Sequence, residues 1–138
     1  TPEWVTAALH ETRVARLATS SPTGEVRLVP VCFAFVEDHL VSAVDHKPKR
    51  TGQLRRLDDI AASGTATILV DHYEEDWPHL WWVRIRGVAE VLTDDDPATR
   101  TALTALAAKY EQYTVQPPRG PVYRVATDEL RWWRFDSA

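Results

Sequence analysis

The stretch LVSAVDHKPKRTGQLRRL, residues 40–57, passes from a short apolar strand at 40–44 through a basic turn into a helix. Pro48 suits the first position of a helix, where its missing N–H would have no partner anyway, and leucines follow at helical spacing. The turn carries three cations, Lys47, Lys49 and Arg50. The predictions for the rest of the chain start from this succession of strand, cations and helix start.

The basic turn has two interpretations. Free amides in the first turn of a helix attract anions, so cations beside them could hold a phosphate group. Cations at a helix start oppose the helix dipole, which favours Asp or Glu there in a purely structural helix. We interpret residues 47–50 as an anion-binding turn, with a solvated run of charges as the alternative.

Length and composition limit the function classes. The 138 residues fit one domain, 1–138, and 16 basic against 20 acidic residues give a net charge of −4, so we expect no nucleic-acid surface. The longest apolar run, 28–36, is far shorter than the roughly 20 residues of a membrane span. A single cysteine, Cys32, excludes an intramolecular disulfide, and the first residues carry no signal-peptide pattern. We therefore expect a cytoplasmic protein without a membrane partner.

Apolar periodicity and turn residues predict a mainly β chain. Helices are expected at 2–11, from Pro48 onward and at 97–109, and the residues 111–121 are expected to form a loop. Strands are expected at 13–19, 25–36, 40–44, 65–73, 80–92, 122–126 and 130–135. Six or seven strands with short helices indicate a mostly antiparallel barrel.

Two of these strands have unusual faces. The strand at 25–36 is apolar on both faces, as in a barrel wall that also meets a partner, and Pro30 favours an edge position or a bulge. In the strand at 80–92 one face carries Trp82, Arg84 and Arg86, which is typical of a ligand or dimer surface rather than a core. Gly87 predicts a bulge or a close backbone approach.

Common catalytic motifs are absent from the sequence. The five histidines form no HxxH or HExxH pattern, so we expect no metal site. There is no GxSxG, GxGxxG or P-loop motif. The Val-Asp-His tripeptides at 44–46 and 70–72 end two strands and are interpreted as structural turns.

Three segments together resemble a known superfamily: RLVPVCF at 27–33, SAVDHKPKR at 42–50 and WVRIRGVAEVL at 82–92. They are similar to the FMN-binding split β-barrels, which include the pyridoxamine 5′-phosphate oxidases. Two sequence segments, VDHKPKRT and LRRL, resemble the branch of that superfamily that depends on coenzyme F420. The resemblance covers about residues 10–135 and implies a split-barrel homodimer with a cofactor at each of two interface sites.

The resemblance also implies which residues contact the cofactor. Lys49, Arg50 and Arg27 would hold its phosphate with Lys47 assisting. Lys47, Arg55 and Arg56 would suit an anionic tail, with solvated side chains as the alternative. Arg27 would contact the cofactor, with the backbone near Val29, Pro30, Val31 and Cys32, and with Ala43 and Val44 passing beside it. Trp82 and Trp133 stand where ring-contacting residues stand in the family.

One departure from the sequence pattern of the pyridoxamine 5′-phosphate oxidases bears on the expected substrate. The oxidases hold the substrate phosphate with an Arg-Leu-His run, and the ending LRWWRFDSA has none. We therefore expect an F420-dependent oxidoreductase that transfers a hydride between the deazaflavin and an unsaturated organic substrate, without a catalytic side chain. The alternatives are an FMN-dependent oxidase or reductase, a haem-associated relative, and a carrier that binds deazaflavin or flavin without turnover.

Overall fold

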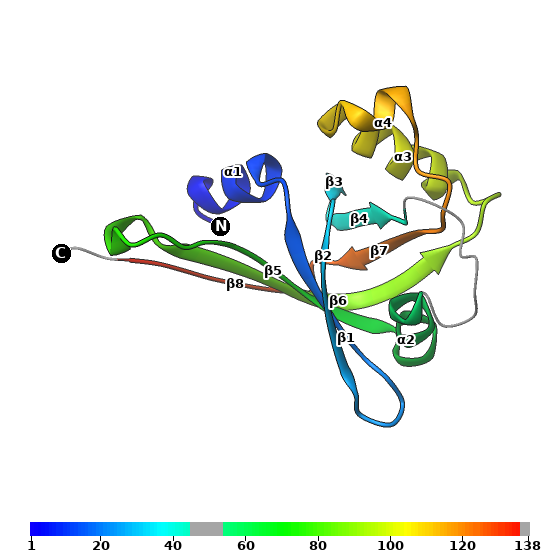
Figure 1. Cartoon of the computed structure of the whole chain (residues 1–138), viewed down its shortest axis with the longest axis horizontal. Coiled ribbons are helices and arrows are strands. Elements are labelled where there is room, and N and C mark those ends of the chain that lie inside the picture. Colours follow the sequence, from blue (N-terminus) through cyan, green and yellow to red (C-terminus); the bar gives the residue numbers. More distant parts are fainter. Residues whose placement is uncertain (45–53, 136–138) are drawn as a thin grey trace.

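A computed structural model describes residues 1–44 and 54–135. Its elements follow one another in the order helix, four strands, helix, two strands, two helices and two strands (Figure 1). The helices are α1 (Glu3–Glu11), α2 (Arg55–Ser63), α3 (Pro97–Lys109) and α4 (Gln112–Val115), with a 3₁₀ turn η1 (Trp77–His79). The strands are β1 (Ala15–Ser20), β2 (Val26–Val31), β3 (Ala34–Val36), β4 (His39–Ala43), β5 (Thr65–His72), β6 (Trp81–Leu92), β7 (Val122–Ala126) and β8 (Glu129–Arg134).

The strands form one antiparallel sheet in the order β2-β1-β5-β6-β7-β4-β3, with β8 paired to β6. This confirms the mainly antiparallel barrel. The described chain contains eight strands rather than six or seven, because the segment expected as one strand at 25–36 divides into β2 and β3. Figure 1 shows β5, β6 and β8 running out from the barrel; we call residues 67–72, 81–86 and β8 the arm.

The division of the long strand occurs at Cys32 and Phe33. The backbone N–H of Phe33 donates to the hydroxyl of Tyr110 at 3.0 Å instead of to a neighbouring strand, and that hydroxyl donates to the carbonyl of Arg13 at 2.8 Å. The side chain of Phe33 is fully buried. A buried N–H needs such a partner, so Tyr110 stabilises the bend that starts β3.

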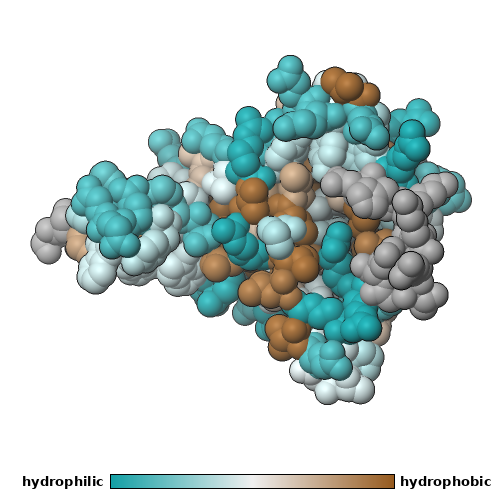
Figure 2. Space-filling view, viewed as in Figure 1, coloured by the Kyte–Doolittle hydropathy of each residue, from teal (hydrophilic) through white to brown (hydrophobic). Residues whose placement is uncertain are grey.

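Pro30 lies in β2 at the edge of the sheet, which confirms the expectation for this residue. One face of this segment is open in the single chain, where Val26 and Leu28 are 74% and 67% exposed. The expectation that a partner covers this face stays a prediction. Hydrophobic residues gather over the middle of the face where β2 runs (Figure 2).

The long strand β6 changes partner along one edge. Its residues 81–86 pair with β8, and its residues 89–92 pair with β7. At the fork, a Cβ added to Gly87 would lie 1.8 Å from the carbonyl oxygen of Ala126, and the carboxylate of Asp128 accepts a hydrogen bond from the N–H of Val88 at 2.8 Å. The predicted close approach at Gly87 is confirmed.

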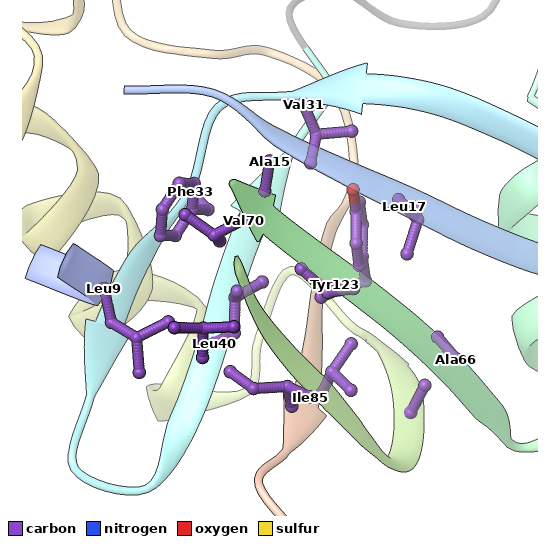
Figure 3. Close-up of a cluster of buried hydrophobic side chains, with 14 of the residues drawn as sticks. Leu9, Ala15, Leu17, Val31, Phe33, Leu40, Ala66, Val70, Ile85 and Tyr123 are labelled. Atoms are coloured by element: carbon purple, nitrogen blue, oxygen red, sulfur yellow. The ribbon is translucent and has the colours of Figure 1, made fainter. Parts of the chain in front are cut away.

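The barrel closes on one main apolar core. Leu17, Leu40, Ile85 and Tyr123 of four different strands, and Phe33 between β2 and β3, are almost completely buried and converge there (Figure 3). A second cluster lies under α3, centred on Ala102 and Leu106. Burial of this many large side chains is the main term that stabilises a domain of this size.

The helices match the sequence analysis in part. As expected, α3 starts at Pro97, and the side chain of Asp96 caps it by accepting from the N–H of Ala98 at 2.9 Å. The expected start at Pro48 lies outside the described residues, and α2 as described begins at Arg55. The loop at 111–121 contains the short helix α4. Within residues 1–44 and 54–135, no helix is long and apolar enough to cross a membrane.

Candidate functional site

Four of the predicted cofactor-contacting residues border one cavity. The ends of β2 and β4 converge there, held together by the hydroxyl of Ser42, which donates to the carbonyl of Cys32 at 2.6 Å. The cavity has a volume of about 200 Å³. Its walls are formed by Val14, Pro30, Val31, Cys32, Ala43, Arg56 and Tyr113. Pro30, Val31, Cys32 and Ala43 thus lie around one cavity, and their predicted contact with the cofactor stays a prediction.

Two polar groups near this cavity lack a well-formed hydrogen bond among the described residues. They are the buried Nε of Arg56, in the first turn of α2, and the hydroxyl of Tyr123. Burial raises the pKa of Tyr123, whereas Ser42 and Arg56, which lie close to its hydroxyl as weak hydrogen-bond partners, lower it. Buried donors without partners are uncommon in folded proteins. A cation and a hydroxyl beside a cavity fit an anionic or hydroxyl-bearing ligand.

Arg27 is engaged by carboxylates. Its Nε lies 3.1 Å from Asp59 Oδ2 and its Nη1 lies 3.2 Å from Glu25. Asp59 is 2% exposed and also accepts a hydrogen bond from Thr19 at 2.8 Å. The sequence analysis missed Asp59, which ties β2 and β1 to α2. Arg27 is not among the residues that line the cavity, and its predicted contact with the cofactor stays a prediction.

Val29 and Val44 support the wall from behind. Val29 is half-buried and packs against the main core. Val44 is buried, its N–H donates to the carbonyl of Pro121 at 3.0 Å, and its carbonyl accepts from Gly120 at 2.9 Å. Neither residue lines the cavity itself, so their predicted contact with the cofactor stays a prediction.

The three cations of the basic turn, Lys47, Lys49 and Arg50, lie outside the described residues. The described chain ends at Val44 and resumes at Leu54. Ala43 and Arg56, close to these two points, both line the cavity. The anchoring of a phosphate by the three cations stays a prediction.

The two predicted ring-contacting residues form a pair on the arm. Trp82 of β6 lies opposite Trp133 of β8 in register, and both line a separate cavity of about 410 Å³. The guanidinium carbon of Arg84 lies 5.2 Å from the centre of the Trp82 ring, within the usual range of a cation–π contact. The two cavities share no lining residue. Within one chain the predicted site is therefore in two parts.

An exposed ion-pair cluster lies at the end of the arm. The carboxylate of Glu74 contacts the rings of His72 and His79, the latter at 2.7 Å. Hydrogen bonds from His72 and then from His79 lower the pKa of Glu74, and the bond to Glu74 raises the pKa of His79. The tripeptide at 70–72 ends β5 as expected, but its interpretation as a turn is wrong, because Asp71 and His72 pair with Trp82 and Trp81 in the sheet. Its twin passes beyond Val44 out of the described residues.

The antiparallel sheet, closed on one main apolar core and accompanied by short helices, is a split β-barrel. A family model described as pyridoxamine 5′-phosphate oxidase matches residues 1–135. The chain belongs to this family. A search of the curated proteins finds no match.

Solved structures share the fold at low sequence identity. A heme storage protein from Vibrio cholerae, HutZ, has a TM-score of 0.76 and 10% identity, over 95% of this chain and 92% of that one. A conserved hypothetical protein from Mycobacterium tuberculosis, Rv2991, has a TM-score of 0.74 and 18% identity, over 97% and 85%. A FAD-binding protein from Mesorhizobium loti has a TM-score of 0.71 and 19% identity, over 94% and 89%.

Proposed function

We propose that the protein is a homodimeric, F420-dependent oxidoreductase that acts on an unsaturated organic substrate. Its two cofactor sites would each combine the cavity between β2 and β4 of one copy with the arm of the other. Membership in a family described as pyridoxamine 5′-phosphate oxidase supports redox chemistry on a flavin-like cofactor. The basic turn, with Lys47, Lys49 and Arg50, favours the deazaflavin branch.

One observation carries this proposal. The predicted contact residues are complete in neither cavity: the cavity beside Arg56 has polar groups but no aromatic pair, and the arm has Trp82 and Trp133 but lies apart. Val26 and Leu28 expose apolar surface on the edge strand next to the first cavity. Exposed apolar strands of this kind mark interaction surfaces. A second copy would cover them and bring the two parts of the site together.

In this arrangement the protein binds and orients rather than reacts. Lys49 and Arg50 would hold the phosphate, with Arg56 donating from the cavity wall and the Tyr123 hydroxyl close by. Apolar residues of β2 and β4 would exclude water from one side of the cofactor ring, and the Trp pair would close the other side, with the substrate between the Trp rings and the cofactor ring. When bound, the deazaflavin supplies hydride transfer, so no side chain needs to act as a nucleophile.

The experiment is a set of separate titrations of the protein with F420, FMN and haem, followed by oxidation of reduced F420 in the presence of quinones, enones and tetrapyrrole breakdown products. Binding of F420 with turnover of one of these compounds is expected. Tight binding of FMN without binding of F420 would reverse the choice of cofactor. A monomer in sedimentation would contradict the composite site.

A second candidate is a binding protein without turnover. One relative in fold is described as a heme storage protein and another as FAD-binding, and the two cavities could hold such a group in this protein as well. Saturable binding without oxidation of any acceptor would favour this function. The FMN-dependent oxidase or reductase would instead show FMN reduction in the presence of substrate.

A further inference from the structure

Two arginines of the arm lie side by side without a counter-charge. Arg84 of β6 and Arg131 of β8 are partners in register, so both side chains project from the same face of the sheet. Like charges directly opposite on one face destabilise a strand pair. Among the described residues no carboxylate lies within 4.0 Å of either guanidinium, whereas the next arginine on this face, Arg86, pairs with Glu129 at 3.4 Å.

The uncompensated pair adjoins a flat aromatic surface. Trp82 and Trp133 stand two residues along the same two strands and on the same face, and the Arg84 guanidinium lies over the Trp82 ring. The cavity of about 410 Å³ at this place has the Trp pair, Arg84 and Asp71 in its wall. This volume lies within the range of small-molecule sites. Two positive charges against the single negative charge of Asp71 leave the face positive.

We propose that this face binds a planar conjugated molecule that carries a carboxylate, with the rings on Trp82 and Trp133 and the carboxylate between Arg84 and Arg131. Two guanidinium groups provide parallel N–H donors, which match the two oxygens of a carboxylate. A π-surface next to them selects for flat molecules. Resting on the proposed function, this assigns the substrate class: an unsaturated carboxylate whose charge is recognised apart from the cofactor phosphate.

Other anions fit this face less well. A nucleic acid needs a row of phosphate contacts, but on this face of the described arm only these two arginines lack a counter-charge, since Arg134 projects from the opposite face. The whole chain also carries a net charge of −4. The cofactor phosphate is expected at the other cavity, which shares no residue with this one. We therefore assign the carboxylate to a second, smaller molecule, and the titrations with F420 and FMN below separate this assignment from binding of an anionic part of the cofactor.

The test compares two probes of equal shape, 2-naphthoate and 2-naphthamide, which differ in charge. Quenching of tryptophan fluorescence, checked by calorimetry, gives both dissociation constants for the whole protein. We expect the wild type to bind naphthoate about tenfold more tightly, as a charge-assisted pair predicts. Arg84→Gln and Arg131→Gln should each reduce that preference to about threefold or less.

The matched control is Arg86→Gln, which removes the same charge from the same strand face but from an arginine that already has Glu129. It should leave the preference for naphthoate unchanged. Equal binding of the two probes by the wild type, or an equal effect of Arg86→Gln, would overturn the assignment. All three variants are at exposed positions, and circular dichroism checks that each is folded.

Titration of the same variants with F420 and FMN separates this inference from the proposed function. If the protein prefers naphthoate but binds neither cofactor, the carboxylate site is supported and the proposed oxidoreductase function is rejected. Loss of cofactor affinity in Arg84→Gln and Arg131→Gln, with both naphthalene probes bound equally, would instead assign the arginine pair to the cofactor and reject the substrate site.

Discussion

The fork in β6 predicts a large destabilisation by Gly87→Ala. The added methyl group would lie 1.8 Å from the carbonyl oxygen of Ala126, so the two backbones must separate by about 1.2 Å to reach even the tight contact limit of 3.0 Å. That shift stretches the hydrogen bond from Val88 to Asp128 and the nearby ladder between β6 and β7. Overpacking costs about 1–3 kcal/mol and each lost hydrogen bond about 1 kcal/mol. We expect a loss of about 3–5 kcal/mol, a large part of the stability of a small domain.

Urea unfolding followed by circular dichroism measures this loss. Gly64→Ala is the matched control, because Gly64 has a positive φ of 71° but nothing within 4 Å of an added Cβ. It should cost only about 1–2 kcal/mol from backbone strain. If Gly87→Ala destabilises the protein no more than Gly64→Ala, steric contact at the fork is not what requires glycine.

Three further outcomes are expected. Asp59→Ala should lower the free energy of unfolding in urea by about 2–4 kcal/mol, because it leaves the half-buried Arg27 without its main partner; a loss below about 1 kcal/mol would contradict the role of the pair. Burial, and then the charge of Arg13, lowers the pKa of Lys109 to about 8 from 10.5. The unfolded chain therefore binds more protons between these values, and stability should rise with pH across this window. Lys109→Met should flatten that rise and stabilise the protein at neutral pH by about 1–2 kcal/mol, allowing for the half-exposed position; an unaltered pH profile would show that the ammonium is not desolvated. Lys49→Ala with Arg50→Ala should weaken cofactor binding in a titration by about 2–4 kcal/mol while leaving urea unfolding unchanged, and an unchanged dissociation constant would refute the anchor.

The sequence predicts most strands because local signals place them. Alternating apolar residues and turn residues give the two ends of nearly every strand, and Pro30 and Gly87 are each interpreted correctly from one residue type. The division into β2 and β3 has no local signal. The group that satisfies the N–H of Phe33 belongs to Tyr110, which is 77 residues away.

The residues of the candidate site are also predicted only in part, because local signals do not show which residues distant in the sequence come together. Residues close in sequence, such as Pro30 and Cys32, line one cavity together. The pairing of Arg27 with Asp59 depends on how α2 packs on β2, and the register of Trp82 with Trp133 depends on where the chain turns after β7. Such long-range registers cannot be read from local periodicity.

Because β6 is the one strand of the described chain that contacts β5, β7 and β8, its backbone sets the spacing between the barrel and the arm. Side chains alternate along a strand, so one residue inserted just before Gly87 would turn Trp82 and Arg84 toward the opposite face while leaving the barrel half in place. Relatives that keep this geometry should thus vary in length at the hairpin tips and keep a constant number of residues through β6.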